Sequence, residues 1–337
     1  MTNSEQRVLI TGCYRTGSEY ITQLLGNHPK LETSMYITNF MRFCWNRYDS
    51  VDEADNYSAL IFDTARRMWL RYGREFDVYD VLETCRESST VDYGLIYDEI
   101  MSDILLSEHA HSWAEKTQLV WTKIPAFLDM FEERKAILIV RDPRSVLASF
   151  KEFTYEPEPA YLTAAFNTLD SMQHGLEYRR GLGSDEFHII RYEDVIREPE
   201  PTLHSAFEFL DLSADHDVLS TDGWTKPSGE PWEANSAFAD SNEEFDPESA
   251  INRWQDTLEP WEVAFSEMIN MVVMEKFGYE TARNDHDQFD FSERVHGHEL
   301  LERAYEQWKR SGEGIEAFPS DPLDSHNWTV NQSYTGE

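Results

Sequence analysis

The stretch LITGCYRTGSEYITQLLGNHP, which runs from Leu9 to Pro29, constrains the fold more than any other, because it joins an apolar run to a helical pattern through a glycine-bearing turn. The apolar residues before Gly12 predict a buried strand, and Ile21, Leu24 and Leu25 recur at helical spacing. Strand, turn and helix in this order are typical of an α/β protein whose turn lies at a helix N-terminus.

Two glycines in this turn, Gly12 and Gly17, bracket four residues, as they do in the phosphate-binding loop of nucleotide triphosphatases. That loop continues with lysine and then serine or threonine, which reach the terminal phosphates and magnesium. Here Ser18 and Glu19 follow the second glycine. The sequence therefore lacks both the lysine and the metal-binding hydroxyl of a triphosphatase.

A cation nevertheless lies inside the turn. Arg15 precedes Thr16, and Ser18 adds a second hydroxyl at the expected start of the helix. Unpaired N–H groups and the positive end of the dipole make a helix N-terminus suitable for an anion. The turn on its own is also consistent with an ordinary connection between a strand and a capped helix.

Composition limits the partners and the compartment. The 337 residues carry 29 basic and 64 acidic side chains, a net charge of −35, which argues against nucleic acid and anionic membranes. Only eight of the basic residues are lysines, a balance that suits high salt, although solubility in ordinary cytoplasm explains it as well. The three cysteines lack metal-type spacing, and no apolar run is long enough to span a membrane. We expect a cytoplasmic protein.

Strand and helix patterns alternate along the chain, which predicts a single α/β domain with a central, mostly parallel sheet flanked by helices. Ligands of such a sheet gather at the carboxyl ends of the strands. The predicted helices cover 55–108, 127–133 and 202–210, and the further predicted strands are Leu119–Lys123, Ala136–Val140 and Phe187–Arg191.

The second informative stretch, AILIVRDPRSVLASFKEF, follows an apolar run. Asp142 is a good N-cap and Pro143 a natural first helical residue, so RDPR predicts the start of a helix. Arg141 and Arg144 flank that start, and Ser149 lies about two turns further on. Guanidinium groups favour bidentate capture of phosphate. Solvated or salt-bridged arginines are an equally good interpretation of this stretch alone.

Together, YRTGSEYITQLLGNHP and VRDPRSVLASF resemble the two cofactor signatures of the sulfotransferases that use 3′-phosphoadenosine 5′-phosphosulfate (PAPS). In that family the first loop grips the 5′-phosphosulfate. The resemblance implies this role for Arg15, Thr16, Gly17 and Ser18. The second signature supplies an arginine and, eight positions later, a serine for the 3′-phosphate, here Arg141 and Ser149.

The resemblance continues in order along the chain to about residue 280. IIRYEDVIREPEPTLHSAFEFLDL is similar to the family's Tyr-Glu-Asp strand end and following helix, and INRWQDTLEPWE with FGYE is similar to its basic-Trp segment and closing Gly-Tyr. VWTKIP resembles the Lys-x-Pro segment before the second signature. These matches add Tyr192 and Arg253 to the implied cofactor-binding residues.

The family's fold is a P-loop-like α/β domain, which we expect over residues 1–283, with 284–337 as an acidic extension that contains one helix and is either packed on the domain or partly flexible. The implied reaction transfers a sulfuryl group from PAPS to an acceptor hydroxyl on a small molecule, lipid or carbohydrate. By analogy with phosphoryl transfer, positioning and fixed positive charge do most of the work. Arg15 would neutralise the developing charge, and no metal is expected. The oligomeric state is not readable from the sequence.

The sequence departs from the family pattern at Glu19, which replaces a hydroxyl, and at Tyr36, which stands where many members with the HP element have a glutamate. Glu32 is the nearest carboxylate after the loop helix and is our predicted catalytic base. An exposed structural glutamate is the competing interpretation of Glu32. Weaker candidates for the base are Glu19, His28, His109 and His111.

Two further stretches suggest binding surfaces. NFMRFCWNRY, from Asn39 to Tyr48, gathers aromatics that either shape an acceptor pocket or pack in the core. TKPSGEPWEANSAF, residues 225–238, predicts a loop that closes over the cofactor, with Lys226 or Arg253 reaching the nucleotide, or else a plain connector.

Two alternatives to a sulfotransferase stay open at this point. A P-loop nucleotide phosphotransferase is supported by the two glycines and by Asp142 after an apolar strand, and the missing lysine counts against it. A non-catalytic nucleotide-binding protein of the same fold is supported by Tyr36 and Glu19, which depart from the catalytic pattern.

Overall fold

The computed structural model describes residues 5–35, 37–107, 109–153, 158–213, 218–220, 224, 249–282 and 291–329. Their centre is a five-stranded sheet in the order β2-β3-β1-β4-β5, and each neighbouring pair is parallel. The strands are β1 (Arg7–Gly12), β2 (Leu31–Met35), β3 (Ser112–Lys116), β4 (Arg134–Val140) and β5 (Phe187–Arg191). Because the strands are parallel, their carboxyl ends lie along one edge, where ligands of such sheets bind.

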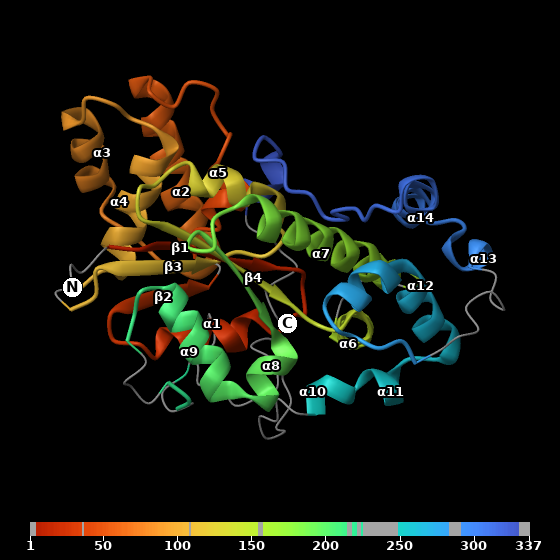
Figure 1. The fold of residues 1–337 in the computed structure, drawn as a ribbon. Helices are drawn as coiled ribbons and strands as arrows, with labels where there is room; N and C mark the ends of the chain where they lie inside the picture. Colours follow the sequence, from red (N-terminus) through yellow and green to blue (C-terminus); the bar gives the residue numbers. More distant parts are fainter. Residues whose placement is uncertain are drawn as a thin grey trace.

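The helices flank this sheet on both faces (Figure 1). They are α1 (Ser18–Gly26), α2 (Ala54–Tyr72), α3 (Val78–Glu87), α4 (Tyr93–Leu105), α5 (Ile124–Leu128), α6 (Pro143–Phe153), α7 (Thr163–Gly181), α8 (Tyr192–Arg197), α9 (Pro199–Phe209), α10 (Ser249–Asn252), α11 (Trp254–Thr257), α12 (Pro260–Lys276), α13 (Ser292–Val295) and α14 (Glu299–Ser311). The predicted α/β domain with a central parallel sheet is confirmed.

The two faces of the sheet belong to two separate apolar clusters. Val8 and Ile10 of β1 pack with α1, α8 and α9, whereas Leu9 belongs to the cluster that α4, α5 and α7 cover. Side chains alternate between faces along a strand, so one strand serves both clusters. In Figure 1, α8 and α9 lie on one side of the sheet and α5 and α7 on the other. This sandwich holds the strand ends in fixed positions.

One predicted strand is wrong. Leu119–Lys123 contains a residue with φ of 58°, Leu119, followed by a 3₁₀ turn over Trp121–Lys123. Its apolar residues are buried, but burial here comes from a turn packed on the core. The strand in this region is β3, which lies earlier in the chain. Its sequence, SWAEK, carries two fully buried charged residues, so it lacks the apolar run that is typical of a buried parallel strand.

The other predicted strands and helices are present, and some of them begin or end at different residues from those predicted. The strands Ala136–Val140 and Phe187–Arg191 are confirmed as parts of β4 and as β5, and α2, α3 and α4 occupy the predicted helical region before residue 108. The helix expected over 127–133 lies earlier in the chain: α5 covers Ile124–Leu128. Strand β2 was not predicted.

The C-terminal part packs on the rest of the chain. Helix α14 contacts α7, and the segment after it runs back along α7 toward α2 (Figure 1). The expected domain limit at Arg283 lies outside the described residues, so the division at that point stays a prediction. Among the helices of the described ranges, none is both long and apolar enough to cross a bilayer.

Candidate active site

The loop between β1 and α1 depends on two residues with left-handed backbone. Arg15 has φ of 67° and Gly17 has φ of 79°. A Cβ on Gly17 would come within 2.2 Å of the Tyr192 ring, so this position requires glycine. Gly17 is also the N-cap of α1. Because glycine offers no side-chain acceptor to the N–H groups of the first turn, an anion can bind them instead.

The two hydroxyls of the loop have internal partners. Thr16 Oγ1 donates to the Cys13 carbonyl oxygen at 3.0 Å, and Ser18 Oγ accepts from Gln118 Nε2 at 3.4 Å. Both side chains are buried. These contacts stabilise the turn, and the binding of a ligand by either hydroxyl stays a prediction.

The two signatures meet in space. Arg15 Nε donates to Ser149 Oγ at 3.0 Å, and Arg141 Nη1 donates to the Arg15 carbonyl oxygen at 2.8 Å. Arg15 follows β1, and Arg141 follows β4, the neighbouring strand. The parallel pairing of these strands therefore brings together residues that are separated by more than a hundred positions in the sequence.

The Tyr192 ring packs against both signatures, beside Gly17 of the first and Arg141 of the second. The Arg141 guanidinium carbon is 4.5 Å from the centroid of its ring, which also fills the space beside Gly17. Burial raises the pKa of Tyr192 to about 12, while the positive charges of Arg141 and Arg253 act in the opposite direction. The phenol is thus a neutral platform that orients Arg141. Arg253 lies on this side of the site, with Nη1 3.9 Å from Glu152 Oε2.

Arg144, the other arginine of RDPR, has a different environment. Its Nη2 is 2.6 Å from Asp142 Oδ2 and its Nη1 is 2.8 Å from Glu267 Oε1, and its guanidinium stacks on Trp254 at 4.2 Å. Asp142 also accepts from the Arg144 backbone N–H at 2.9 Å, which confirms its role at the helix start. For Arg144 the salt-bridged interpretation is correct: it ties α6 to α12.

Sequence reasoning missed Lys116, the last residue of β3. Its side chain is fully buried, with Nζ 3.4 Å from Glu19 Oε1. Burial lowers the pKa of Lys116 to about 7; Glu19 raises it, and the nearby charges of Arg15 and Arg42 lower it further. A cation from β3 therefore lies beside the loop. The signal was hidden because β3 was not recognised as a strand.

Arg42 is a second cation that sequence reasoning left without a role. It lies in a π-helical turn over Phe40–Cys44, and its Nη1 donates to the Tyr14 hydroxyl at 2.7 Å. Tyr14 directly precedes Arg15. The stretch from Asn39 to Tyr48 thus does approach the loop, whereas Phe40, Met41 and Cys44 are core residues.

Glu115 explains why this turn has its conformation. The buried carboxylate accepts from the backbone N–H of Asn39 at 2.7 Å and of Phe40 at 3.2 Å. The hydroxyls of Thr38 and Tyr97 also donate to it. A buried carboxylate needs such a set of donors. Glu115 therefore fixes the start of the turn that carries Arg42.

The predicted base, Glu32, is not brought to this edge. It pairs in register with Trp113 at the amino end of β2, whereas Met35, at the carboxyl end, pairs with Lys116. Three residues of strand separate the two levels, about 10 Å. The structure therefore does not place Glu32 together with Arg15, and its catalytic role stays a prediction.

The histidine candidates occupy structural or distant positions. His28 is buried, with Nε2 2.9 Å from the Ser213 carbonyl oxygen and its ring on Phe207. His109 and His111 precede β3, at the amino edge. Across the described ranges, no group of three or more His, Cys, Asp or Glu side chains is arranged to hold a metal ion.

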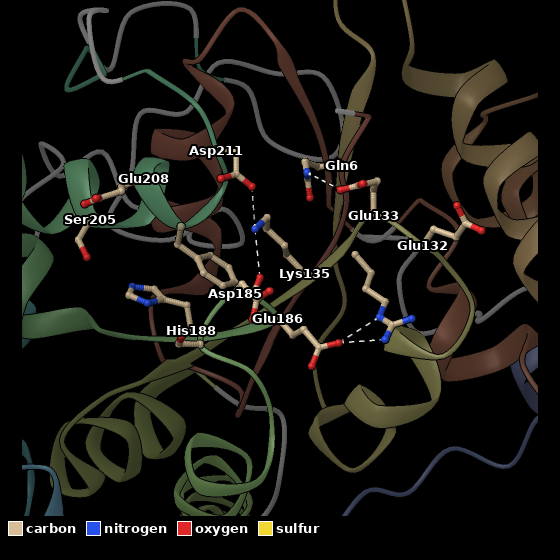
Figure 2. A pocket seen from close by; sticks show the side chains of 13 residues that line it. Gln6, Glu132, Glu133, Lys135, Asp185, Glu186, His188, Ser205, Glu208 and Asp211 are labelled. Atoms are coloured by element: carbon tan, nitrogen blue, oxygen red, sulfur yellow. Dashed lines mark hydrogen bonds and ion pairs between the residues drawn. The ribbon is translucent and has the colours of Figure 1, made fainter. Parts of the chain in front are cut away.

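An open cavity of about 810 Å³ lies at the opposite edge of the sheet, beside the amino ends of β4 and β5. Figure 2 shows its basic residues directed at acidic partners. Lys135 Nζ is 2.9 Å from Asp211 Oδ2, and Arg134 Nη2 is 2.9 Å from Glu186 Oε1. Because this cavity lies away from the strand ends that carry the loop, it is not the candidate active site.

Two predictions fall outside the described residues: Tyr36 and the loop over 225–238 with Lys226.

The parallel sheet brings the turn at Gly17 together with Arg15 and Arg141 at its carboxyl edge, where ligands of such sheets bind. Comparison with protein families identifies the class of protein, because the sulfotransferase family matches residues 7–217. The chain therefore belongs to the sulfotransferase family, whose members transfer sulfuryl groups. No curated protein sequence matches the chain.

Solved structures show the same fold. The sulfotransferase domain from the Synechococcus PCC 7002 olefin synthase superposes with a TM-score of 0.55 at 19% identity, covering 83% of this chain and 97% of that domain. The sulfotransferase domain from the curacin biosynthetic pathway gives 0.53 at 18% identity, covering 83% and 99%. At these identities the likeness concerns the fold.

Proposed function

We propose that the protein transfers a sulfuryl group from PAPS to an acceptor hydroxyl on a small molecule, lipid or carbohydrate. The observation that carries this proposal is the contact between the two signatures, in which Arg15 bonds Ser149 and Arg141 bonds the backbone of Arg15. A donor with phosphate groups on both sides of its ribose needs two adjacent anion sites.

The residues present fit such a donor. The turn at Gly17 leaves the first N–H groups of α1 for the 5′-phosphosulfate, with Arg15 beside them. Arg141 and Ser149 would hold the 3′-phosphate, and Tyr192 supports Arg141 from below. Arg253 adds positive charge on that side.

The chemistry follows from charge. When the sulfur–oxygen bond to the 5′-phosphate breaks, negative charge grows on the bridging oxygen, and a fixed cation stabilises it most when it does not need to reorganise. Arg15 is held in place by Ser149 and by the turn. Lys116 and Arg42 add to the positive potential beside it.

The acceptor hydroxyl must lose a proton during transfer. Glu32 is the proton acceptor predicted from the sequence; it lies about 10 Å of strand away from the carboxyl edge, so its role needs a direct test. The test is Glu32→Gln with turnover measured at saturating donor: a large loss of turnover with unchanged affinity for adenosine 3′,5′-bisphosphate (PAP) supports the role, and wild-type turnover removes it.

Ligand binding tests the donor. A ligand that binds only the folded protein raises its stability by about 2.7 kcal/mol at a hundredfold excess over the dissociation constant. We expect PAP to raise the melting temperature, and 5′-AMP and ATP with magnesium to raise it less. A shift with ATP and magnesium alone would favour the phosphotransferase instead.

Transfer tests the catalysis. Incubation with PAPS labelled in the sulfuryl group, followed by separation of labelled products over a panel of phenols, sterols and sugars, should give a labelled acceptor. PAP binding without any transfer or PAPS turnover would leave a non-catalytic nucleotide-binding protein.

A further inference from the structure

The C-terminal segment, defined here as residues 312–329, lies outside the region that matches the family. It is nevertheless fixed to the same domain. Gln173 of α7 donates to the Gly312 carbonyl oxygen at 2.8 Å and accepts from the Gly314 N–H at 2.9 Å. The Ala317 N–H donates to Asn167 Oδ1 at 2.6 Å. A Cβ at Gly314 would lie 2.3 Å from the α7 backbone, so the segment lies directly on that helix.

From α7 the segment reaches the residues next to both signatures. The centroid of the Phe318 ring lies 6.5 Å from that of Tyr14 and 6.3 Å from that of Phe150. The Tyr14 and Phe150 rings stack on each other with their centroids 6.4 Å apart. Tyr14 precedes Arg15, and Phe150 follows Ser149. The three rings therefore form one aromatic cluster on the flank of the Arg15–Ser149 contact.

Polar contacts hold the segment on the side of the π-helical turn. Arg42 donates to both Ser320 and Tyr14. Glu316 lies near Lys123 and Arg42; burial raises the pKa of Glu316, and these two cations act against that shift. Further along, Arg47 donates to the Pro322 carbonyl oxygen at 2.6 Å. The segment is thus attached on both sides of Phe318.

We propose that the C-terminal segment is a wall of the active site and that the Phe318 ring keeps water away from the group being transferred. The inference rests on the proposed function. Water is the competing acceptor: its oxygen attacks the sulfur, the sulfur–oxygen bond to the 5′-phosphate breaks, the bisphosphate leaves with the electron pair, and sulfate and protons are released. Exclusion of water by an apolar cluster suppresses this reaction.

The test needs no knowledge of the acceptor. Sulfate release from labelled PAPS, without acceptor, is compared between the wild type, Phe318→Ala and the control Leu323→Ala, whose side chain is 68% exposed on the same segment. We expect Phe318→Ala to release sulfate several-fold faster, with unchanged affinity for PAP, and Leu323→Ala to behave as the wild type. Equal rates in Phe318→Ala and the wild type, or equal increases in both variants, would overturn the inference.

Hydrogen exchange on the wild type gives a second measurement if Phe318→Ala does not fold. Addition of PAP should slow exchange in residues 13–17 and also in residues 315–320, because Phe318 contacts the neighbours of both signatures. Protection of the loop alone overturns this inference and leaves the proposed function intact. Protection of neither region overturns both.

Discussion

The two edges of the sheet treat positive charge in opposite ways. At the amino edge, Lys135 and Arg134 face Asp211 and Glu186. At the carboxyl edge, cations from three adjacent strands or their following loops, Lys116, Arg15 and Arg141, gather at one site, where Glu19 lies 3.4 Å from Lys116. Opposite charges at a surface need no ligand, whereas clustered like charges repel one another, and an anion relieves that repulsion.

In a very acidic chain, the local charge at a site indicates anion binding better than the net charge does. A net charge of −35 describes the surface as a whole and predicts no anion-binding site. Burial is the main cause of the lowered pKa of Lys116; Glu19 acts against the shift, and the positive charges of Arg15 and Arg42 add to it, so these cations lie close together at this edge. Substitutions of these cations test the difference between the two edges.

Arg15→Ala should abolish transfer. The variant removes the cation that we propose stabilises the breaking bond, together with its contact to Ser149, and loss of one preorganised donor costs about a hundredfold to a thousandfold in turnover. The matched control is Lys135→Ala at the amino edge, which should keep wild-type turnover. Retained activity in Arg15→Ala would contradict the proposed site.

Arg144→Ala should destabilise the fold. It leaves Asp142 and Glu267 without the guanidinium that both contact, and breaking one partner of a buried ion pair costs about 3–5 kcal/mol. Chemical denaturation measures the loss. An unchanged midpoint would show that the contacts between α6 and α12 do not depend on this residue.

Arg141→Ala should weaken PAP binding with little change in stability. Hydrogen bonds to charged groups contribute about 1.5–3 kcal/mol, so the affinity should fall about tenfold to a hundredfold. Calorimetric titration measures it, with Arg134→Ala as the control arginine at the amino edge. Equal affinities for the variant and the wild type would place the 3′-phosphate elsewhere.

The affinity for PAP should depend on pH through Lys116. The pKa of Lys116 is lowered to about 7, so its positive charge is present below that pH and lost as the pH rises through it. Affinity should therefore fall between about pH 6 and about pH 8 more steeply in the wild type than in Lys116→Met. Parallel profiles would show that the Lys116 charge does not reach the ligand. The variant also corrects for titration of the ligand's own phosphates.

Local sequence patterns predicted most of the framework. The strand, the turn and the helix from Leu9 onward are local features, and so is the Asp142-capped start of α6, because capping and period depend on neighbouring residues. The family resemblance added the prediction that the two signatures serve one ligand, and the structure brings the signatures into contact through Arg15 and Ser149. Strand β3 was missed because Glu115 and Lys116 are buried for reasons that lie elsewhere in the chain.

The roles of individual side chains were harder to predict from the sequence. Arg141 and Arg144 look equivalent in the sequence, and their difference arises from partners on distant elements: Tyr192 after β5 for one, and Glu267 on α12 for the other. Glu32 follows the loop helix closely in sequence, yet the direction of β2 places it at the far edge. Proximity along a chain is a poor guide to proximity in a parallel sheet, where each strand spans the whole layer.

Neighbouring residues are sufficient to encode the α/β class and the turn between β1 and α1, because a buried strand, a glycine with a left-handed backbone and an amphipathic helix depend on residues within reach of one another. Packing of the sheet and its helices selects which cations lie together, and it brings Phe318 of the C-terminal segment beside Tyr14 and Phe150. The physical reason is that these contacts join residues far apart in the chain, and their energies exist only once the sheet and its helices have packed.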